Sequence, residues 1–162
     1  MDLYFSPYAC SMVVRIVADA AGVALALREA DLYTKRCTGD GADYLAVNPR
    51  GQVPVLVDGG EAITQIVAIV SYLDDRFPQH GFLPREPLAR ARVLETLMWM
   101  NNTVHPTFTH VFMPFKFAST PESQAEIKAH GAQLYAPMLA EIEAMAAAAA
   151  ARGRAYLGGD KF

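Results

Sequence analysis

The chain has 162 residues, of which 52% are hydrophobic and 19% charged, and its formal net charge is -3. This length fits one ordinary domain or two small ones, and the composition is typical of a folded globular protein rather than a disordered one. Because the charge balance is slightly acidic and no basic stripe occurs, neither nucleic acid nor a membrane is expected as a partner.

The N-terminus, MDLYFSP, lacks the basic start and apolar core of a signal peptide, and no apolar segment reaches the roughly 20 residues of a membrane-spanning helix. We therefore expect a cytoplasmic protein. Its only cysteines, Cys10 and Cys37, form no C-x-x-C pair, so we expect two reduced thiols. The four histidines are scattered without H-E-x-x-H spacing, and no metal is expected.

Strand and helix patterns alternate through the first half of the chain. The periodic runs are 2–5, 13–21, 26–32, 50–64 and 65–77. Gly22 is a typical C-cap of the first helix, and Asp58-Gly59-Gly60 predicts a hairpin turn that divides the run 50–64 into two strands. The last helix stops at Pro78. The predicted order is βαβ, a connecting helical segment, and then ββα.

Residues 78–87, PQHGFLPREP, carry three prolines and a glycine, which break periodic structure and indicate an interdomain linker. After this segment the strand signal disappears, and the apolar spacing predicts one long helix over 88–117. Pro106 is expected to kink that helix, because proline lacks the amide donor and collides with the preceding turn.

A second helix is predicted to begin at Thr120, with Pro121 at its first position. The apolar residues expected on one face of this helix are Ile127, Leu134, Met138, Ile142 and Met145. The alanine run 146–151 extends the helix, and Pro137 should bend it.

Cys10 and Ser11 stand where the first strand gives way to the first helix. The free amides and positive dipole end of a helix favour an anion, so the Cys10 thiolate should be stabilised and able to attack a disulfide. The alternatives are that Cys10 is a small buried hydrophobe and that Ser11 only caps the helix.

A proline at the entry of a strand cannot supply a ladder hydrogen bond, so Val53-Pro54 indicates an edge or a tight turn, with a cis bond as one option. In that geometry the amide and carbonyl of Val53 are free to pair with an extended ligand. An ordinary turn is the alternative.

Four segments, in order and correctly spaced, resemble the bacterial beta class of cytosolic glutathione S-transferases: SPYACS, DLYTKRCTGDGADYLAVNPRGQVPVL, AIVSYLDDRFP and TVHPTF. The resemblance implies an α/β thioredoxin-like N-terminal domain over 1–77, a linker over 78–87, and an all-helical domain over 88–162. It also implies glutathione as co-substrate, a small electrophilic second substrate, a role in detoxification, and a homodimer.

The same resemblance implies the roles of individual residues. Cys10 corresponds to the catalytic cysteine that faces the glutathione sulfur and forms a mixed disulfide with it, and Ser11 to its hydroxyl neighbour. Lys35 corresponds to the lysine that reaches the glycine carboxylate, although a solvated surface lysine is the alternative. Val53 and Pro54 correspond to the backbone pair that grips the cysteinyl portion.

Gln65 and Ile66 correspond to the start of the helix that binds the γ-glutamyl carboxylate through free amides. His105 corresponds to a histidine on the second-substrate side of the cleft, and Phe5 stands at another position of that side. From spacing alone, a histidine such as His105 is more often an ordinary helix-surface or core residue.

Several positions depart from the family's pattern. Phe5 replaces a frequent tyrosine, and Gln65-Ile66 replaces an acidic residue followed by a small or hydroxyl residue. Pro106 replaces a lysine, and Met98 replaces an asparagine that often contacts ligand across the dimer. Because a charge that would meet the ammonium group of glutathione is lost, we expect binding weaker than in typical members.

The segment RAYLGGDKF resembles the family's YLxGDxF segment, which leads into a buried helix, and the sequence ends at Phe162 before that helix. We therefore expect a reduced helical domain, an exposed apolar face that favours self-association, and glutathione binding retained better than conjugation. The alternatives are a non-catalytic homologue, acting as a scaffold or as an inactive truncated form, and a glutaredoxin-like reductase. The absent C-x-x-C pair argues against the reductase.

Overall fold

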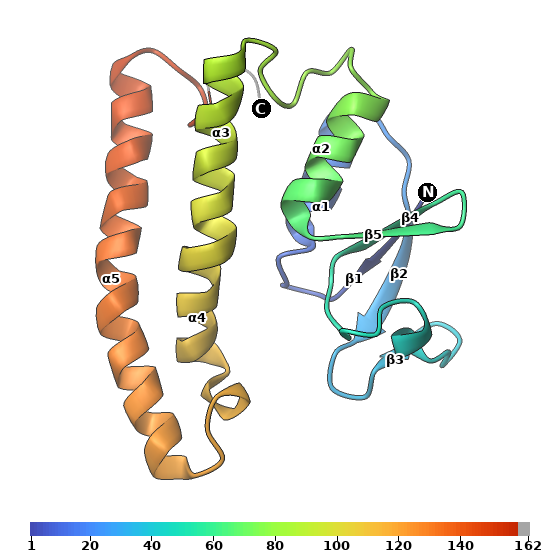
Figure 1. Ribbon diagram of the computed structural model, residues 1–162, viewed down its shortest axis with the longest axis vertical. Coiled ribbons are helices and arrows are strands. Elements are labelled where there is room, and N and C mark those ends of the chain that lie inside the picture. The colour runs from blue at the N-terminus through green and yellow to red at the C-terminus, as the bar shows by residue number, and fades with distance from the viewer. Residues whose placement is uncertain (159–162) are drawn as a thin grey trace. The chain divides into compact units, whose positions relative to one another are not determined.

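The computed structural model describes residues 1–158, and the chain forms two compact units, Met1–Leu83 and Pro84–Phe162 (Figure 1). The first unit is built on a sheet with the strand order β3-β2-β1-β4-β5. Its strands are β1 (Asp2–Phe5), β2 (Ala26–Asp31), β3 (Arg36–Cys37), β4 (Val55–Asp58) and β5 (Glu61–Thr64). β1 pairs parallel with β2 and antiparallel with β4, so the sheet is mixed.

Two helices, α1 (Met12–Ala20) and α2 (Ile66–Arg76), cover one face of this sheet (Figure 1). The buried cluster beneath them consists of Leu3, Val14, Leu56, Ile69 and Leu73. Successive strand residues point to opposite faces, so Val55, next to Leu56, joins a second cluster on the other face. There it packs with Tyr44 of the short 3-10 helix η1 (Tyr44–Ala46). Each fully buried Leu or Ile stabilises the unit by about 2 kcal/mol.

The predicted thioredoxin-like order of strands and helices is confirmed. Gly22 follows α1 with φ +63°, and the turn between β4 and β5 is made by Gly59 and Gly60, both with positive φ, as glycine permits. The connecting helical segment is η1. The sequence did not predict β3, because two residues are too few to show a period-2 pattern.

The second unit is helical. Its elements are α3 (Pro87–Trp99), the π-helical turn η2 (Met100–Val104), α4 (His105–Phe112), the 3-10 turn η3 (Pro114–Lys116) and α5 (Pro121–Ala151). α5 runs beside α4 (Figure 1), and a Cβ at Gly131 of α5 would lie 3.0 Å from the Cβ of His110, so a larger residue there would force His110 to shift by a few tenths of an ångström. The single kinked helix predicted over 88–117 is wrong in two details, because a π-helical turn interrupts it and α4 ends at Phe112. The wider π turn ends at Val104, two residues before Pro106, whose missing N–H leaves a carbonyl of the preceding turn without its α-helical donor.

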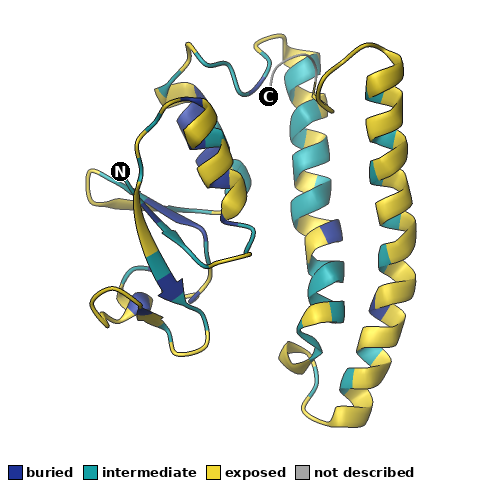
Figure 2. Cartoon of the chain, turned by 180° about the vertical axis from the view of Figure 1, so that it is seen from behind, coloured by how far each residue is buried: buried dark blue, intermediate teal, exposed yellow. Residues whose placement is uncertain are grey.

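α5 begins as predicted, since the Ser123 N–H donates to Thr120 Oγ1 at 3.3 Å, and the alanine run is helical. Leu134, one of the residues expected on one apolar face of α5, is 48% exposed, whereas the neighbouring Tyr135 is half-buried, with its ring 5.3 Å from the ring of Phe108. Figure 2 shows few buried residues along α3 to α5.

By length and composition alone, α5 is apolar enough to cross a membrane, with a mean hydropathy of 1.2 over its most apolar window. This finding corrects the expectation that no segment of the sequence reaches that limit. A single helix of this kind is weak evidence for a membrane span, because the criterion uses length and composition alone; 6% of the window is buried.

Candidate functional site

The strand register brings three loops of the first unit to one end of the sheet. Tyr4, near the end of β1, pairs with Val55 at the start of β4, and Val55 pairs with Thr64 at the end of β5. The loop 6–11, the Val53-Pro54 turn and the start of α2 therefore all lie at this end. All the predicted site residues of the first unit except Lys35 belong to these loops or to the elements they join.

Cys10 and Val53 are in contact across 43 positions of sequence. The Cys10 thiol donates a weak hydrogen bond to the Val53 carbonyl, with Sγ and O 3.6 Å apart, and the Val53-Pro54 bond is cis. The prediction that both polar groups of Val53 are free is thus half right. Within residues 1–158 no backbone acceptor faces the Val53 N–H, whereas the carbonyl already has the thiol as a partner.

Burial raises the pKa of the Cys10 thiol above its ordinary value, although the N–H groups of Cys10 and Ser11 act in the opposite direction. Burial disfavours the thiolate by more free energy than the hydrogen bonds from these two N–H groups stabilise it. The predicted stabilised thiolate is therefore wrong for the unliganded protein, in which Cys10 is a neutral thiol at neutral pH. A neutral thiol is also the form that donates to the Val53 carbonyl.

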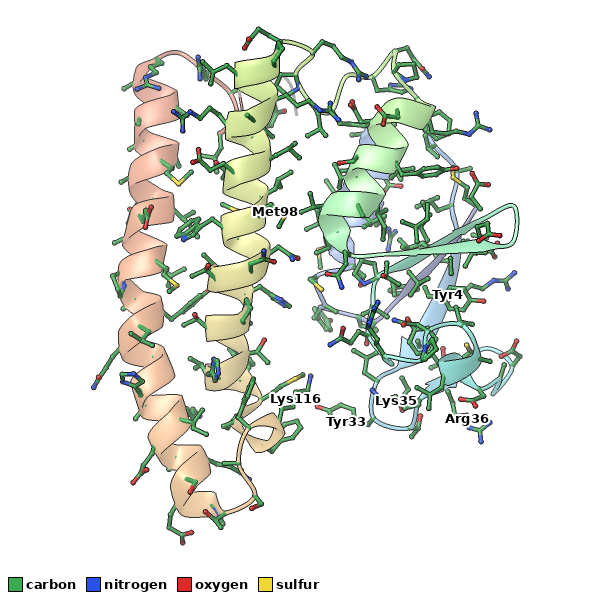
Figure 3. All side chains as sticks on the ribbon, in the orientation of Figure 1. Tyr4, Tyr33, Lys35, Arg36, Met98 and Lys116 are labelled. Carbon is green, nitrogen blue, oxygen red and sulfur yellow. The ribbon has the colours of Figure 1, made fainter. Side chains whose placement is uncertain are left out.

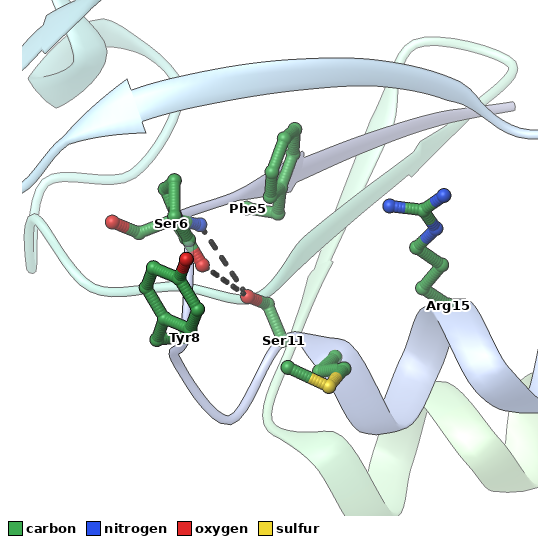
Figure 4. Close-up of a pocket in the computed structure, with 7 residues that line it drawn as sticks. Phe5, Ser6, Tyr8, Ser11 and Arg15 are labelled. Carbon is green, nitrogen blue, oxygen red and sulfur yellow. Dashed lines mark hydrogen bonds between the residues drawn. The ribbon is translucent and has the colours of Figure 1, made fainter.

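Ser11 stands at the N-cap position of α1, but its side chain caps no amide of that helix. Its buried hydroxyl donates to the Ser6 carbonyl at 3.3 Å and accepts from the Ser6 N–H at 3.4 Å (Figure 4). The hydroxyl therefore closes the loop 6–11 and has no free proton to offer to a ligand.

A shallow depression of about 180 Å³ lies beside this loop, lined by Phe5, Ser6, Pro7, Tyr8, Ser11, Met12 and Arg15 (Figure 4). It is smaller than a typical small-molecule site, which takes about 300 Å³ or more. Cys10, Val53 and Gln65 do not line it. The depression is therefore not the place where the predicted ligand-binding groups converge.

Lys35 (Figure 3) follows β2 in a left-handed conformation, with φ +58°. Its half-buried side chain donates from Nζ to the Gly51 carbonyl at 2.9 Å. The ammonium group is therefore placed next to the Val53-Pro54 turn rather than fully solvated.

Gln65 precedes α2 with φ +73°, and its exposed side chain makes no capping hydrogen bond. Ile66 is the first residue of α2. The N–H groups of the first helical turn have no intrahelical acceptor and lie at the positive end of the helix dipole. That these amides bind a carboxylate, as the resemblance implies, stays a prediction.

Phe5 ends β1 and is half-buried. His105 begins α4 with an exposed side chain, and partial desolvation, followed by the positive charge of Lys116, lowers its pKa. Met98 lies on α3 (Figure 3). His105 and Met98 belong to the second unit, and their part in a ligand site stays a prediction.

Two buried residues that the sequence reasoning did not single out act on the same turn. The Tyr44 hydroxyl and the Asn48 side-chain amide both donate to the Gln52 carbonyl, each at 2.7 Å. Burial raises the pKa of Tyr44 to about 12. The available signal was the stretch YLAVNPRGQVP, in which an Asn-Pro turn and a tyrosine directly precede the strand entry. Within the described residues no cluster of three or more His, Cys, Asp or Glu side chains is placed to hold a metal ion.

The family model described as "Glutathione S-transferase, N-terminal domain" matches residues 1–81. Among curated proteins, glutathione S-transferase GstA of Escherichia coli O157:H7 is 39% identical over 124 residues, which are 75% of this chain and 59% of that protein. The chain thus spans less than two thirds of the length of this relative.

Solved structures agree with the sequence matches. The beta-class glutathione S-transferase of Sphingomonas chungbukensis is 32% identical with a TM-score of 0.76, covering 88% of this chain and 68% of that one. A sphingomonad glutathione S-transferase complexed with glutathione is 34% identical with a TM-score of 0.77, covering 90% and 70%. With the matched N-terminal domain and its mixed sheet, these likenesses show that the chain belongs to the glutathione S-transferase family and is similar to its bacterial beta-class members.

Proposed function

We propose that this protein binds glutathione at the end of the sheet where Cys10, Val53 and the start of α2 meet. The observation that carries the proposal is Val53, whose N–H has no backbone acceptor within residues 1–158 and whose carbonyl accepts from the Cys10 thiol. The sphingomonad relative, which was solved with glutathione, supports it.

Each part of glutathione finds complementary groups in this arrangement. The Val53 N–H donates to the cysteinyl backbone, while the cis Pro54 closes that side of the turn. The γ-glutamyl carboxylate accepts from the first amides of α2, beginning at Ile66, with Gln65 beside it. Lys35 pairs with the glycine carboxylate and remains within reach of the Gly51 carbonyl.

The proposed reaction is conjugation of glutathione to a small electrophile, and the family resemblance implies that Phe5 and His105 each act toward the electrophile. The glutathione thiol loses its proton to solvent, its sulfur attacks the electrophilic carbon, and a displaced leaving group departs with its bonding electrons. On ligand binding the neutral Cys10 thiol turns its single proton from the Val53 carbonyl, 3.6 Å away, to the glutathione thiolate and stabilises it by a hydrogen bond. The Ser11 hydroxyl donates its proton to the Ser6 carbonyl, so Ser11 acts only by holding the conformation of the loop 6–11.

A second reaction is thiol–disulfide exchange. The Cys10 thiolate attacks oxidised glutathione, a mixed disulfide forms at Cys10, and one reduced glutathione leaves with the electron pair of the broken S–S bond. The raised pKa of Cys10 keeps its thiolate fraction low, so we expect this exchange to be slow at neutral pH. We further propose a cytoplasmic homodimer with a role in detoxification, as the family resemblance implies.

Gln65-Ile66 favours a second candidate function, a non-catalytic member that binds glutathione without turning it over. An amide replaces the carboxylate that would meet the ammonium group of the ligand, and a branched side chain stands where a small one is usual. Binding without detectable conjugation of any electrophile would support this alternative.

Calorimetric titration with reduced glutathione, followed by intact mass after incubation with oxidised glutathione, tests the proposal. We expect saturable binding and a glutathionyl adduct that disappears in Cys10→Ala. Cys37→Ala is the matched control and should keep both, because Cys37 lies in the core cluster of the first unit. Absence of saturable binding would contradict the proposal.

A further inference from the structure

The turn before β4 is held through its carbonyl oxygens. Gly51, Gln52 and Val53 each accept a hydrogen bond from a side chain: Lys35 Nζ at 2.9 Å, Tyr44 and Asn48 at 2.7 Å each, and Cys10 Sγ at 3.6 Å, respectively. Among these three carbonyls and within residues 1–158, only that of Gln52 receives two side-chain donors, and both donors are neutral.

Both donors to the Gln52 carbonyl are rigidly held. Tyr44 is fully buried, and its ring lies 5.8 Å from that of Tyr4 in β1. Asn48 is 4% exposed, and its Oδ1 accepts from the Arg50 N–H at 3.1 Å, which fixes the orientation of the side-chain amide. Neither side chain is accessible enough to contact a ligand at the turn.

The Gln52 carbonyl and the Val53 N–H belong to the same planar peptide group. In a trans peptide they point in opposite directions, and the cis bond of this turn is the following one. Holding the Gln52 oxygen on the side of Tyr44 and Asn48 therefore turns the Val53 N–H away from them. That N–H is the group without a backbone acceptor within residues 1–158.

We propose that Tyr44 and Asn48 are positioning residues that orient the Val53 N–H for its ligand by holding the other end of its peptide plane. The inference rests on the proposed function, in which this N–H donates to the glutathione backbone. Without the two donors, the peptide plane is ordered only when the ligand binds. The free-energy cost of that ordering lowers the affinity for glutathione.

Calorimetry with reduced glutathione tests the effect on affinity. We expect Tyr44→Phe, which removes one donor and keeps the ring, to weaken binding about five-fold, a change of ~1 kcal/mol. Asn48→Asp keeps the acceptor for Arg50 but loses the donor, and should weaken binding more. Both side chains donate to one oxygen, so their effects should not be additive. The loss of glutathione-binding free energy in the double variant should differ from the sum of the losses in the two single variants.

Tyr72→Phe is the matched control, because the Tyr72 hydroxyl also donates within the first unit, to Asp58 Oδ2 at 2.6 Å, but not to the turn. It should lower the melting temperature while leaving the glutathione Kd unchanged. If Tyr44→Phe lowers the melting temperature and leaves the Kd unchanged, or if Tyr72→Phe weakens binding equally, the role is only structural and the proposal is overturned.

A ligand-free measurement separates this inference from the proposed function. The nitrogen-15 order parameter of the Val53 amide should lie near 0.85 in the parent protein and fall clearly in Tyr44→Phe, with no change in Tyr72→Phe. An unchanged order parameter in Tyr44→Phe overturns the inference even if glutathione binds. If the order parameter falls in Tyr44→Phe but the parent protein does not bind glutathione, the proposed function is overturned and, with it, the role of the two residues in recognition.

Discussion

Cys10 combines two properties that decide its chemistry. Its thiol donates to the Val53 carbonyl, and burial raises its pKa. Both favour the protonated form in the unliganded protein. The residue is therefore better suited to stabilise a neighbouring thiolate than to attack as one.

Alkylation of Cys10 by iodoacetamide should show this pKa directly. The rate rises with pH as the thiolate forms, and we expect its inflection above the ordinary value of 9.0, because burial disfavours the charged form. Peptide mapping separates Cys10 from Cys37, and the urea-unfolded chain supplies the reference. An inflection at or below the reference value would contradict the assignment.

Gly51 is the residue whose replacement should disturb the turn most directly. Its φ is +59°, and a Cβ there would lie 3.1 Å from Lys35 Nζ and 3.2 Å from Leu45 Cδ2. Gly51→Ala should lower the free energy of unfolding by about 1–2 kcal/mol from the backbone conformation alone, measured by urea denaturation. Gly39→Ala, in open space and without positive φ, is the control, and equal losses in the two variants would contradict this account.

At the scale of elements, α3 begins with a carboxylate cap. The Glu86 side chain accepts from the N–H groups of Leu88 and Ala89, and these two hydrogen bonds lower its pKa. A group whose pKa is lowered in the folded state stabilises the fold above its unfolded pKa. That contribution is lost as the pH falls through the folded pKa.

Glu86→Gln should therefore be less stable than the parent at neutral pH, and the difference should shrink as the pH falls below about 4.5. The measurement is the free energy of unfolding of both proteins by urea at several pH values. Because glutamine still offers an amide oxygen to the helix, the difference isolates the charge. A difference that stays constant with pH would show that the charge does not contribute.

The elements that the sequence predicted are those with long, regular periodicity or clear end signals. Gly22, the Asp58-Gly59-Gly60 turn and the Thr120 cap were predictable from the sequence, because each has a local physical cause. The two-residue β3 and the π turn before Pro106 were not, since their hydrogen bonding depends on tertiary context.

The site was predictable only where the chain itself carries the signal. Cys10 and Val53-Pro54 were found from the sequence, because a thiol at a helix start and a proline at a strand entry are local patterns. Tyr44 and Asn48 were not, since their common acceptor, the Gln52 carbonyl, is a backbone atom that no side-chain pattern reveals. The raised pKa of Cys10 likewise follows from burial, which is a property of the fold.

At the scale of the whole molecule, the two units differ in their cores. Both buried clusters identified in the described residues lie in the first unit, and they are joined through β1 and β4. α5 has a single buried residue, Gly131, and exposes large apolar side chains such as Leu134 and Leu139. The first unit is thus expected to be the more stable part.

Native-state hydrogen exchange should show this difference. Amides of β1, β4 and α2 should be protected longest, and those of α5 should exchange earlier, because few buried apolar contacts hold that helix. Mass spectrometry of peptides from each element measures the order. Protection of α5 that outlasts that of β4 would contradict the expectation.

The central claim, that glutathione binds at the end of the sheet around Val53, is tested most directly by titrating nitrogen-15-labelled protein with reduced glutathione. We predict saturable shifts of the Cys10, Val53 and Ile66 amides, with the amides around Gly153 unchanged. No saturable shift, or shifts confined to α3–α5, would contradict the account.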